Sequence, residues 1–142
     1  SAIDYWIFCH LIDDGDAFGK NQQLLTYDNK KFFIHPYDLD TSYGNQYDGS
    51  LTGGHDSFFV PESLLFKRLD SLFASDLKKR YTELRSWLTP TYVINQYRQW
   101  VDSIGEDNYE KEYEKWKNNK SDFNYLKSQV MKAFKVCDDA WF

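Results

Sequence analysis

The 142 residues fit one compact domain, and an aromatic fraction of 19% favours a packed core over disorder. The formal net charge of -5 argues against nucleic acid as the main partner, because binding to a phosphate backbone needs a basic surface. No run of about 18 apolar residues occurs, so the sequence predicts no membrane span. Cys9 and Cys137 each lie in an apolar helical pattern and are predicted to be free, buried thiols.

The chain opens with a predicted helix and a loop. Apolar residues recur every four positions between Ile3 and Leu11, which indicates one buried helix face. Ile12–Gly19 is rich in glycine and aspartate, which predicts a loop that needs backbone conformations unfavourable for most residues. Within this loop, Asp13 and Asp14 are interpreted as a solvated turn.

A β-hairpin is predicted next. Two short apolar runs, Gln22–Tyr27 and Lys31–His35, are separated by the turn-forming pair Asp28–Asn29. Because two strands alone are not stable in water, we expect helices to cover this hairpin.

The remainder is predicted to be an irregular segment followed by a helical bundle. Thr41–Pro61 is rich in glycine and has no periodicity, which is typical of functional or mobile loops. The pattern then indicates about five helices, with the tyrosines and tryptophans between residues 81 and 116 expected in the core. The helix N-caps are predicted at Ser75, Thr89 and Ser121.

Four oxygen-bearing side chains flank the predicted hairpin: Asp16, Asn21, Asp38 and Asp40. The hairpin is expected to return Asp38 to the side of Asn21. Such a cluster suits a hard divalent cation that holds phosphates, with one carboxylate left to accept a proton. Protein kinases place an aspartate, an asparagine five residues later, a hairpin and a metal-binding aspartate in this order.

The three histidines carry less information. His10, His35 and His55 have no metal-ligand spacing. His10 or His35 could orient a loop carboxylate, but a structural role is the favoured interpretation of both.

These residues resemble the spore coat protein H (CotH-type) kinase family of atypical protein kinases. The resemblance rests on Asp16, Asn21, the run Pro36-Tyr37-Asp38-Leu39-Asp40 and the pair Tyr43-Gly44. The family has an aspartate, an asparagine, a Pro-Trp-Asp-x-Asp motif and an aromatic-glycine pair, so Tyr37 stands where tryptophan is usual. Weaker similarity continues through the helical part to Lys115-Trp116, which extends the resemblance over nearly the whole chain.

The resemblance implies a mostly α fold with a small β-hairpin, the C-terminal lobe of a protein-kinase-like (α+β) fold. Residues 1–142 are then a single domain, and the N-terminal lobe of the kinase domain is not contained in this chain. The implied activity is transfer of phosphate from ATP to serine or threonine with Mg²⁺ or Mn²⁺. Asp16 is the implied proton acceptor, and Asn21 and Asp38 are the implied cofactor-binding metal ligands. Asp40 is implied to be a further metal ligand or a structural carboxylate.

The implied partners are a protein substrate of a coat or surface assembly and the missing lobe of the same polypeptide. The compartment stays open between a spore coat, a cell surface and a virion. One alternative is a non-catalytic structural or binding module of a spore coat, cell-surface or phage-tail assembly. A metal-dependent hydrolase is less favoured, because the sequence has no second base or histidine ligand set.

Overall fold

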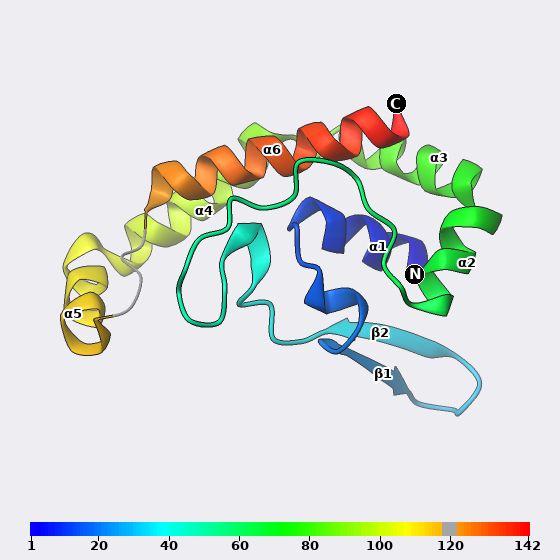
Figure 1. Cartoon of the computed structure of the whole chain (residues 1–142), viewed down its shortest axis with the longest axis horizontal. Helices are drawn as coiled ribbons and strands as arrows, with labels where there is room; N and C mark the ends of the chain where they lie inside the picture. The colour runs from blue at the N-terminus through cyan, green and yellow to red at the C-terminus, as the bar shows by residue number, and fades with distance from the viewer. Residues whose placement is uncertain (118–121) are drawn as a thin grey trace.

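The computed structural model describes residues 1–117 and 122–142, which form a mostly helical fold with one small antiparallel sheet (Figure 1). The helices are α1 (Ala2–Leu11), α2 (Leu64–Leu72), α3 (Ala74–Arg85), α4 (Pro90–Ile104), α5 (Glu106–Trp116) and α6 (Phe123–Trp141). The strands are β1 (Gln22–Thr26) and β2 (Phe32–Pro36), and two 3-10 turns, η1 (Asp16–Phe18) and η2 (Ser42–Gly44), lie on either side of them. The predicted mostly α fold with a small hairpin is therefore confirmed.

Helix α1 lies at the centre of the core, where it packs against α3 and α6. The prediction of a helix here is confirmed, but the helix is buried on more than the one face that was predicted. Trp6, Ile7 and Cys9 are all fully buried although they point in different directions around the helix axis. A helix that is apolar on most sides is buried on most sides. Phe8, on the remaining side, stays partly exposed.

Helices α3 and α6 complete the core around α1. Tyr81 of α3 is fully buried, and its hydroxyl donates a hydrogen bond of 2.6 Å to Asp138 of α6. Arg85 donates to the same carboxylate from Nε at 2.9 Å, so a half-buried ion pair joins the two helices. The free, buried state predicted for Cys9 and Cys137 is confirmed.

The helix ends agree with the predicted caps in part. Thr89 caps α4 as predicted, since its hydroxyl accepts from the Tyr92 backbone N–H at 3.1 Å. The prediction for Ser75 is wrong: α3 begins at Ala74, because the single residue Phe73 joins it to α2 and leaves no room for a separate cap. The prediction for Ser121 lies outside the described residues, and Asp122 caps α6.

The aromatic residues of α4 and α5 are largely outside the core, which corrects the predicted aromatic core between residues 81 and 116. Trp100 is 68% exposed and Trp116 is 61% exposed. The reason is the arrangement of the helices, since α4 packs on α6 and α5 packs on α4 at one end of the molecule (Figure 1). The outer faces of α4 and α5 therefore lack a covering element among the described residues.

The hairpin pairs as predicted but is not covered by helices. β1 and β2 are antiparallel, with Gln22 opposite Pro36 and Thr26 opposite Phe32. Figure 1 shows the hairpin extending away from the helices, and Leu24 and Phe32 are 60% and 56% exposed. The expectation of helical cover is wrong because only Ile34 packs against the core.

The segment between η2 and α2 is irregular, as predicted, yet it is tied to α6. It runs across α6 before it reaches α2 (Figure 1). Lys132 of α6 donates to the carbonyls of Gly53 and Gly54 at 2.6 and 3.3 Å. The Tyr125 hydroxyl of α6 donates to the Tyr43 carbonyl at 3.1 Å. These bonds fix both ends of the glycine-rich stretch beside the loop that follows α1.

Candidate active site

A buried carboxylate, Asp14, joins the loop after α1 to the segment after the hairpin. Its Oδ1 accepts from the Ala17 backbone N–H and from the Thr41 hydroxyl, both at 3.1 Å. Its Oδ2 accepts from the Ser42 hydroxyl at 3.2 Å. Because a buried carboxylate is tolerated only when it is well hydrogen-bonded, Asp14 is a structural link. The solvated turn predicted for Asp13 and Asp14 is wrong, since Asp14 is fully buried and Asp13 is largely so.

The turn η1 sets the position of Asp16. The Asp16 carbonyl accepts from the backbone N–H groups of Gly19, Lys20 and Asn21, each at 3.1 Å. This tight turn places Asp16 and Asn21 on one short, closed loop. The Asp16 carboxylate is partly exposed, and its Oδ2 forms an ion pair of 2.8 Å with Lys20.

Asn21 and Asp38 meet at the base of the hairpin. Asn21 is 8% exposed, and its Nδ2 donates a hydrogen bond of 2.7 Å to the Asp38 carbonyl. The Tyr37 backbone N–H donates to the Asn21 carbonyl at 3.3 Å. Asp38 has a left-handed backbone, with φ of 54°, which aspartate tolerates better than most residues. The amide oxygen of Asn21 is then the atom that this side chain can offer to a cation.

The carboxylates of Asp16, Asp38 and Asp40 all act on the charge of Lys20. The hydrogen bond with Asp16 raises the pKa of Lys20, and the charges of Asp38 and Asp40 raise it further. Asp40 is exposed, and its carbonyl accepts from Asn45 Nδ2 at 2.7 Å. Within residues 1–117 and 122–142, no three histidine, cysteine or acidic side chains are grouped so that they could hold a metal ion.

A polar pocket of about 350 Å³ lies beside Asp16. Its lining includes Asp13, Asp16, Thr41, Thr52 and His55, which come from the loop after α1, from the residue before η2 and from the irregular segment. Asn21, Asp38 and Asp40 are not part of this lining. The predicted site residues are thus divided between the pocket, which Asp16 faces, and the base of the hairpin.

The pair of Asp13 and His55 was missed by sequence reasoning. Asp13 Oδ2 accepts from the His55 backbone N–H at 2.9 Å, and its Oδ1 contacts the ring Nδ1 at 2.5 Å. The hydrogen bond to Asp13 raises the pKa of His55 against the opposing effect of burial. The two residues are 42 positions apart, so no local spacing pointed to them. The loop carboxylate is bound by His55 and not by His10 or His35, the two candidates from sequence.

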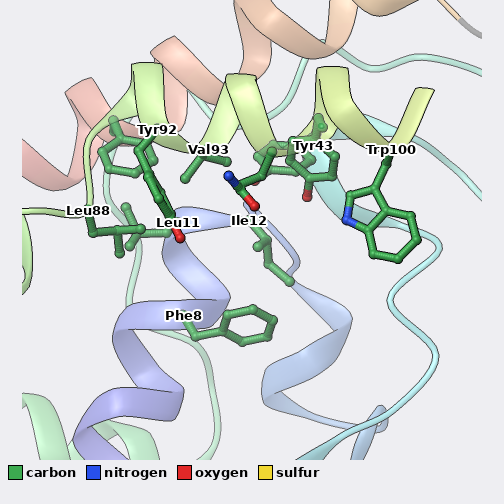
Figure 2. A pocket seen from close by; sticks show the side chains of 11 residues that line it. Phe8, Leu11, Ile12, Tyr43, Leu88, Tyr92, Val93 and Trp100 are labelled. Carbon is green, nitrogen blue, oxygen red and sulfur yellow. The ribbon is translucent and has the colours of Figure 1, made fainter. Parts of the chain in front are cut away.

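A second pocket, of about 330 Å³, is apolar and lies between α1 and α4. Figure 2 shows Tyr92, Val93 and Trp100 of α4 facing the α1 side chains Phe8 and Leu11. Leu88, which precedes α4, lies beside them. Its lining contains no carboxylate and no histidine, which leaves it without a group for acid–base chemistry at neutral pH. The polar pocket is therefore the candidate active site.

Comparison with known proteins gives one family. A family model described as CotH kinase protein matches residues 1–135. No curated protein and no solved structure matches the chain. No helix in the described part of the chain is long and apolar enough to cross a membrane. The family match extends from the first helix into α6 and includes every predicted site residue, and on this basis the chain belongs to the CotH kinase protein family.

Proposed function

We propose that this chain is part of a CotH-like protein kinase that transfers phosphate from ATP to serine or threonine of a coat or surface protein. The family match over residues 1–135 is the observation that carries the proposal. The order of Asp16, Asn21 and Asp38 around a hairpin supports it, because protein kinases need a proton acceptor and two oxygen ligands in this order.

Asp16 is the proposed proton acceptor. In the transfer step, the acceptor hydroxyl oxygen forms a bond to the γ-phosphorus and the bond from that phosphorus to the leaving oxygen of ADP breaks. The hydroxyl proton passes to the Asp16 carboxylate, and the leaving oxygen keeps the electron pair. Lys20 holds Oδ2 of Asp16, which leaves Oδ1 to face the hydroxyl. The polar pocket beside Asp16 is the proposed place of the acceptor side chain.

Asn21, Asp38 and Asp40 are the proposed metal ligands. All three provide oxygen atoms, which Mg²⁺ and Mn²⁺ prefer. The bond from Asn21 to the Asp38 carbonyl holds the amide at the Asp38 backbone, and the joint effect of Asp38 and Asp40 on Lys20 indicates a local excess of negative charge. This donor set fits a cation that also takes ligands from the nucleotide phosphates. When bound, such a cation neutralises charge on those phosphates.

Nucleotide binding is proposed to need a second lobe. Protein kinases cover the phosphates with a glycine-rich loop and a strand lysine. We assign these parts to an N-terminal lobe of the same polypeptide, so we expect the 142-residue chain alone to show no transfer.

The alternative function is a non-catalytic binding module of a coat, cell-surface or phage-tail assembly. One observation favours it: Leu24 and Phe32 expose much of their apolar surface on the hairpin. Large exposed apolar surfaces mark sites of interaction with other proteins. Under this alternative the carboxylates hold a cation without phosphoryl transfer.

The test is an Asp16→Asn substitution in a polypeptide that contains this chain together with the nucleotide-binding lobe. We expect transfer from radiolabelled ATP to fall by about 10²–10⁴-fold, the usual contribution of a general base. Asp16 is partly exposed, so the melting temperature should change little. Asp107→Asn, on the exposed surface of α5, is the matched control and should keep full activity. Near-full activity of the Asp16 variant would refute its assignment, and an inactive parent would favour the binding module.

A further inference from the structure

The pair of Asp13 and His55 is held in place from several sides. Asp13 has a left-handed backbone, with φ of 52°, and its two carboxylate oxygens contact the backbone N–H and the ring Nδ1 of His55. The His55 ring stacks on Phe59, with ring centroids 4.3 Å apart and an interplanar angle of 28°. Lys132 fixes the preceding residues through the carbonyls of Gly53 and Gly54. Both the position and the tilt of the imidazole are therefore set by the fold.

The backbone before His55 is also specialised for this contact. Gly54 has φ of 66°, and a Cβ atom at this position would lie 2.2 Å from Asp13 Oδ2. Only glycine fits such a close approach in a left-handed conformation. The sequence thus provides a glycine where the Asp13 carboxylate has to reach the His55 backbone.

The imidazole faces the same pocket as Asp16. His55, Asp13 and Asp16 all belong to its lining, and the His55 Cε1 atom lies 3.9 Å from the Cβ position of Gly15, the residue before Asp16. Cε1 is bonded to both ring nitrogens. Because Asp13 takes Nδ1, the nitrogen left to bind a ligand in the pocket is Nε2.

The net effect of the groups around His55 is to raise its pKa above that of a free imidazole, which favours the protonated ring. Asp13 raises the pKa of His55 most, and Asp56 raises it further, whereas burial and the Lys132 ammonium lower it. Lys132 is itself paired with Asp56 at 2.6 Å, which weakens its effect. His10 of α1 also interacts electrostatically with His55, and Asp16 lines the same pocket. A protonated ring held by Asp13 presents Nε2–H as a hydrogen-bond donor.

We propose that His55 is a phosphoryl-binding residue, whose Nε2–H donates to an oxygen of the phosphoryl group as that group reaches the hydroxyl deprotonated by Asp16. The inference rests on the proposed function. His55 keeps its proton throughout, while the hydroxyl proton goes to Asp16 and the electron pair of the broken bond goes to ADP. A fixed donor directed at an oxygen that carries charge in the transition state contributes without reorganisation of the site.

The binding test uses the 142-residue chain with inorganic phosphate as the probe. The Cε1–H resonances of His10, His35 and His55 are followed by NMR at about pH 6, where an imidazole near its ordinary pKa is largely protonated. We expect saturable shifts of the His55 resonance and none of His35, which lies on the exposed hairpin. In His55→Gln, reported by the amide resonances of Gly15 and Thr52, phosphate should bind about tenfold more weakly, as for loss of one charged hydrogen bond. His35→Gln is the matched control and should bind like the original chain.

A second variant, Asp13→Asn, keeps the shape of the site. Asparagine tolerates the left-handed backbone and still accepts from the His55 N–H, so the loop should fold. Phosphate affinity should fall at about pH 7.5, where the His55 ring without its carboxylate partner is mostly neutral. At about pH 5.5 the affinity should return to that of the original chain, because the ring is then protonated without help. A merely structural role for Asp13 predicts no such recovery.

The outcomes separate this inference from the proposed function. Phosphate binding that is absent, or unchanged in His55→Gln, would overturn the role of His55. Transfer by the full polypeptide that persists at the original rate in His55→Gln would overturn it as well, and would leave the proposed kinase activity standing. Phosphate bound at His55 in a polypeptide that transfers nothing would support the binding site and refute the kinase.

Discussion

His10 shows how strongly one residue can couple the core to pH. Five aromatic rings surround its imidazole: Trp6, Phe18, Phe58, Phe59 and Trp141. Its Nε2 is buried and has no hydrogen-bond partner among the described residues. Burial, together with the charge of His55, lowers the pKa of His10 to about 3. The unfolded chain therefore binds a proton at His10 below its ordinary pKa of about 6.5, whereas the folded chain does not.

This difference predicts an acid-sensitive fold. The free energy of unfolding should decrease as the pH falls from about 6.5 towards the folded-state pKa of His10. His10→Phe keeps an aromatic ring and removes the unpaired nitrogen. We expect this variant to be as stable as the original chain or more stable at neutral pH, by up to about 1–3 kcal/mol, and to lose less stability in acid. Urea unfolding at several pH values measures both effects, and equal losses in acid for the two chains would contradict the role of His10.

At the scale of elements, the loop after α1 and the glycine-rich segment form the site by touching each other directly. Gly44 and Gly54 meet backbone to backbone, since a Cβ on Gly44 would lie 2.2 Å from the Gly54 nitrogen. Gly54 in turn lies against Asp13. The pocket therefore depends on residues without side chains as much as on its acidic ones.

A pair of glycine substitutions tests this close packing. Gly53 and Gly54 both have positive φ, but only Gly54 has atoms within contact distance of its Cβ position. Alanine at either position should cost about 1–2 kcal/mol for the left-handed backbone. Gly54→Ala should cost about 1–3 kcal/mol more, as overpacking does, and should lower the pKa of His55 towards its ordinary value by displacing Asp13. Denaturant unfolding and NMR titration give the two readouts. Equal stability losses for the two variants would show that the contact with Asp13 is unimportant.

The elements differ in how far sequence could predict them. The hairpin and the start of α4 were predictable, because short apolar runs around the turn-forming pair Asp28–Asn29 and the capping residue Thr89 are local signals. The junction at Phe73 was not, since no local pattern shows two helices sharing one residue. The order of Asp16, Asn21 and Asp38 could be recognised along the chain, whereas the contact of Asp13 with His55 depends on how two distant segments pack.

On the scale of the whole molecule, helices gather on one side of α1 and the hairpin extends from the other (Figure 1). Burial in the core and exposure on the hairpin therefore follow from which side of α1 a residue lies on. The same reasoning explains why apolar periodicity overestimated the core, since periodicity indicates an apolar face but not the partner that covers it.

This asymmetry predicts which apolar residues matter for stability in the isolated chain. Leu24→Gln and Phe32→Gln change side chains that are already largely exposed, so each should alter the free energy of unfolding by no more than about 0.5 kcal/mol. Ile34→Gln is the matched comparison on the same hairpin, and it should destabilise clearly because Ile34 packs against the core. Thermal or urea unfolding measures all three. A large loss for Leu24→Gln or Phe32→Gln would mean that the hairpin is covered in solution.

The hydrogen bonds of Asn21 and Asp14 at the base of the hairpin have a consequence for protein engineering. Asn21, just before β1, donates a hydrogen bond to the Asp38 carbonyl, just after β2. Asp14 accepts hydrogen bonds from Thr41 and Ser42. These bonds hold both ends of the hairpin in place. The tip of the hairpin around Asn29 is exposed and lies at the opposite end of the hairpin from these hydrogen bonds. Exposed loop tips tolerate insertions best. A fluorescent reporter, an affinity tag or a new pair of chain ends can therefore be placed at Asn29 without disturbing Asp16 or His55.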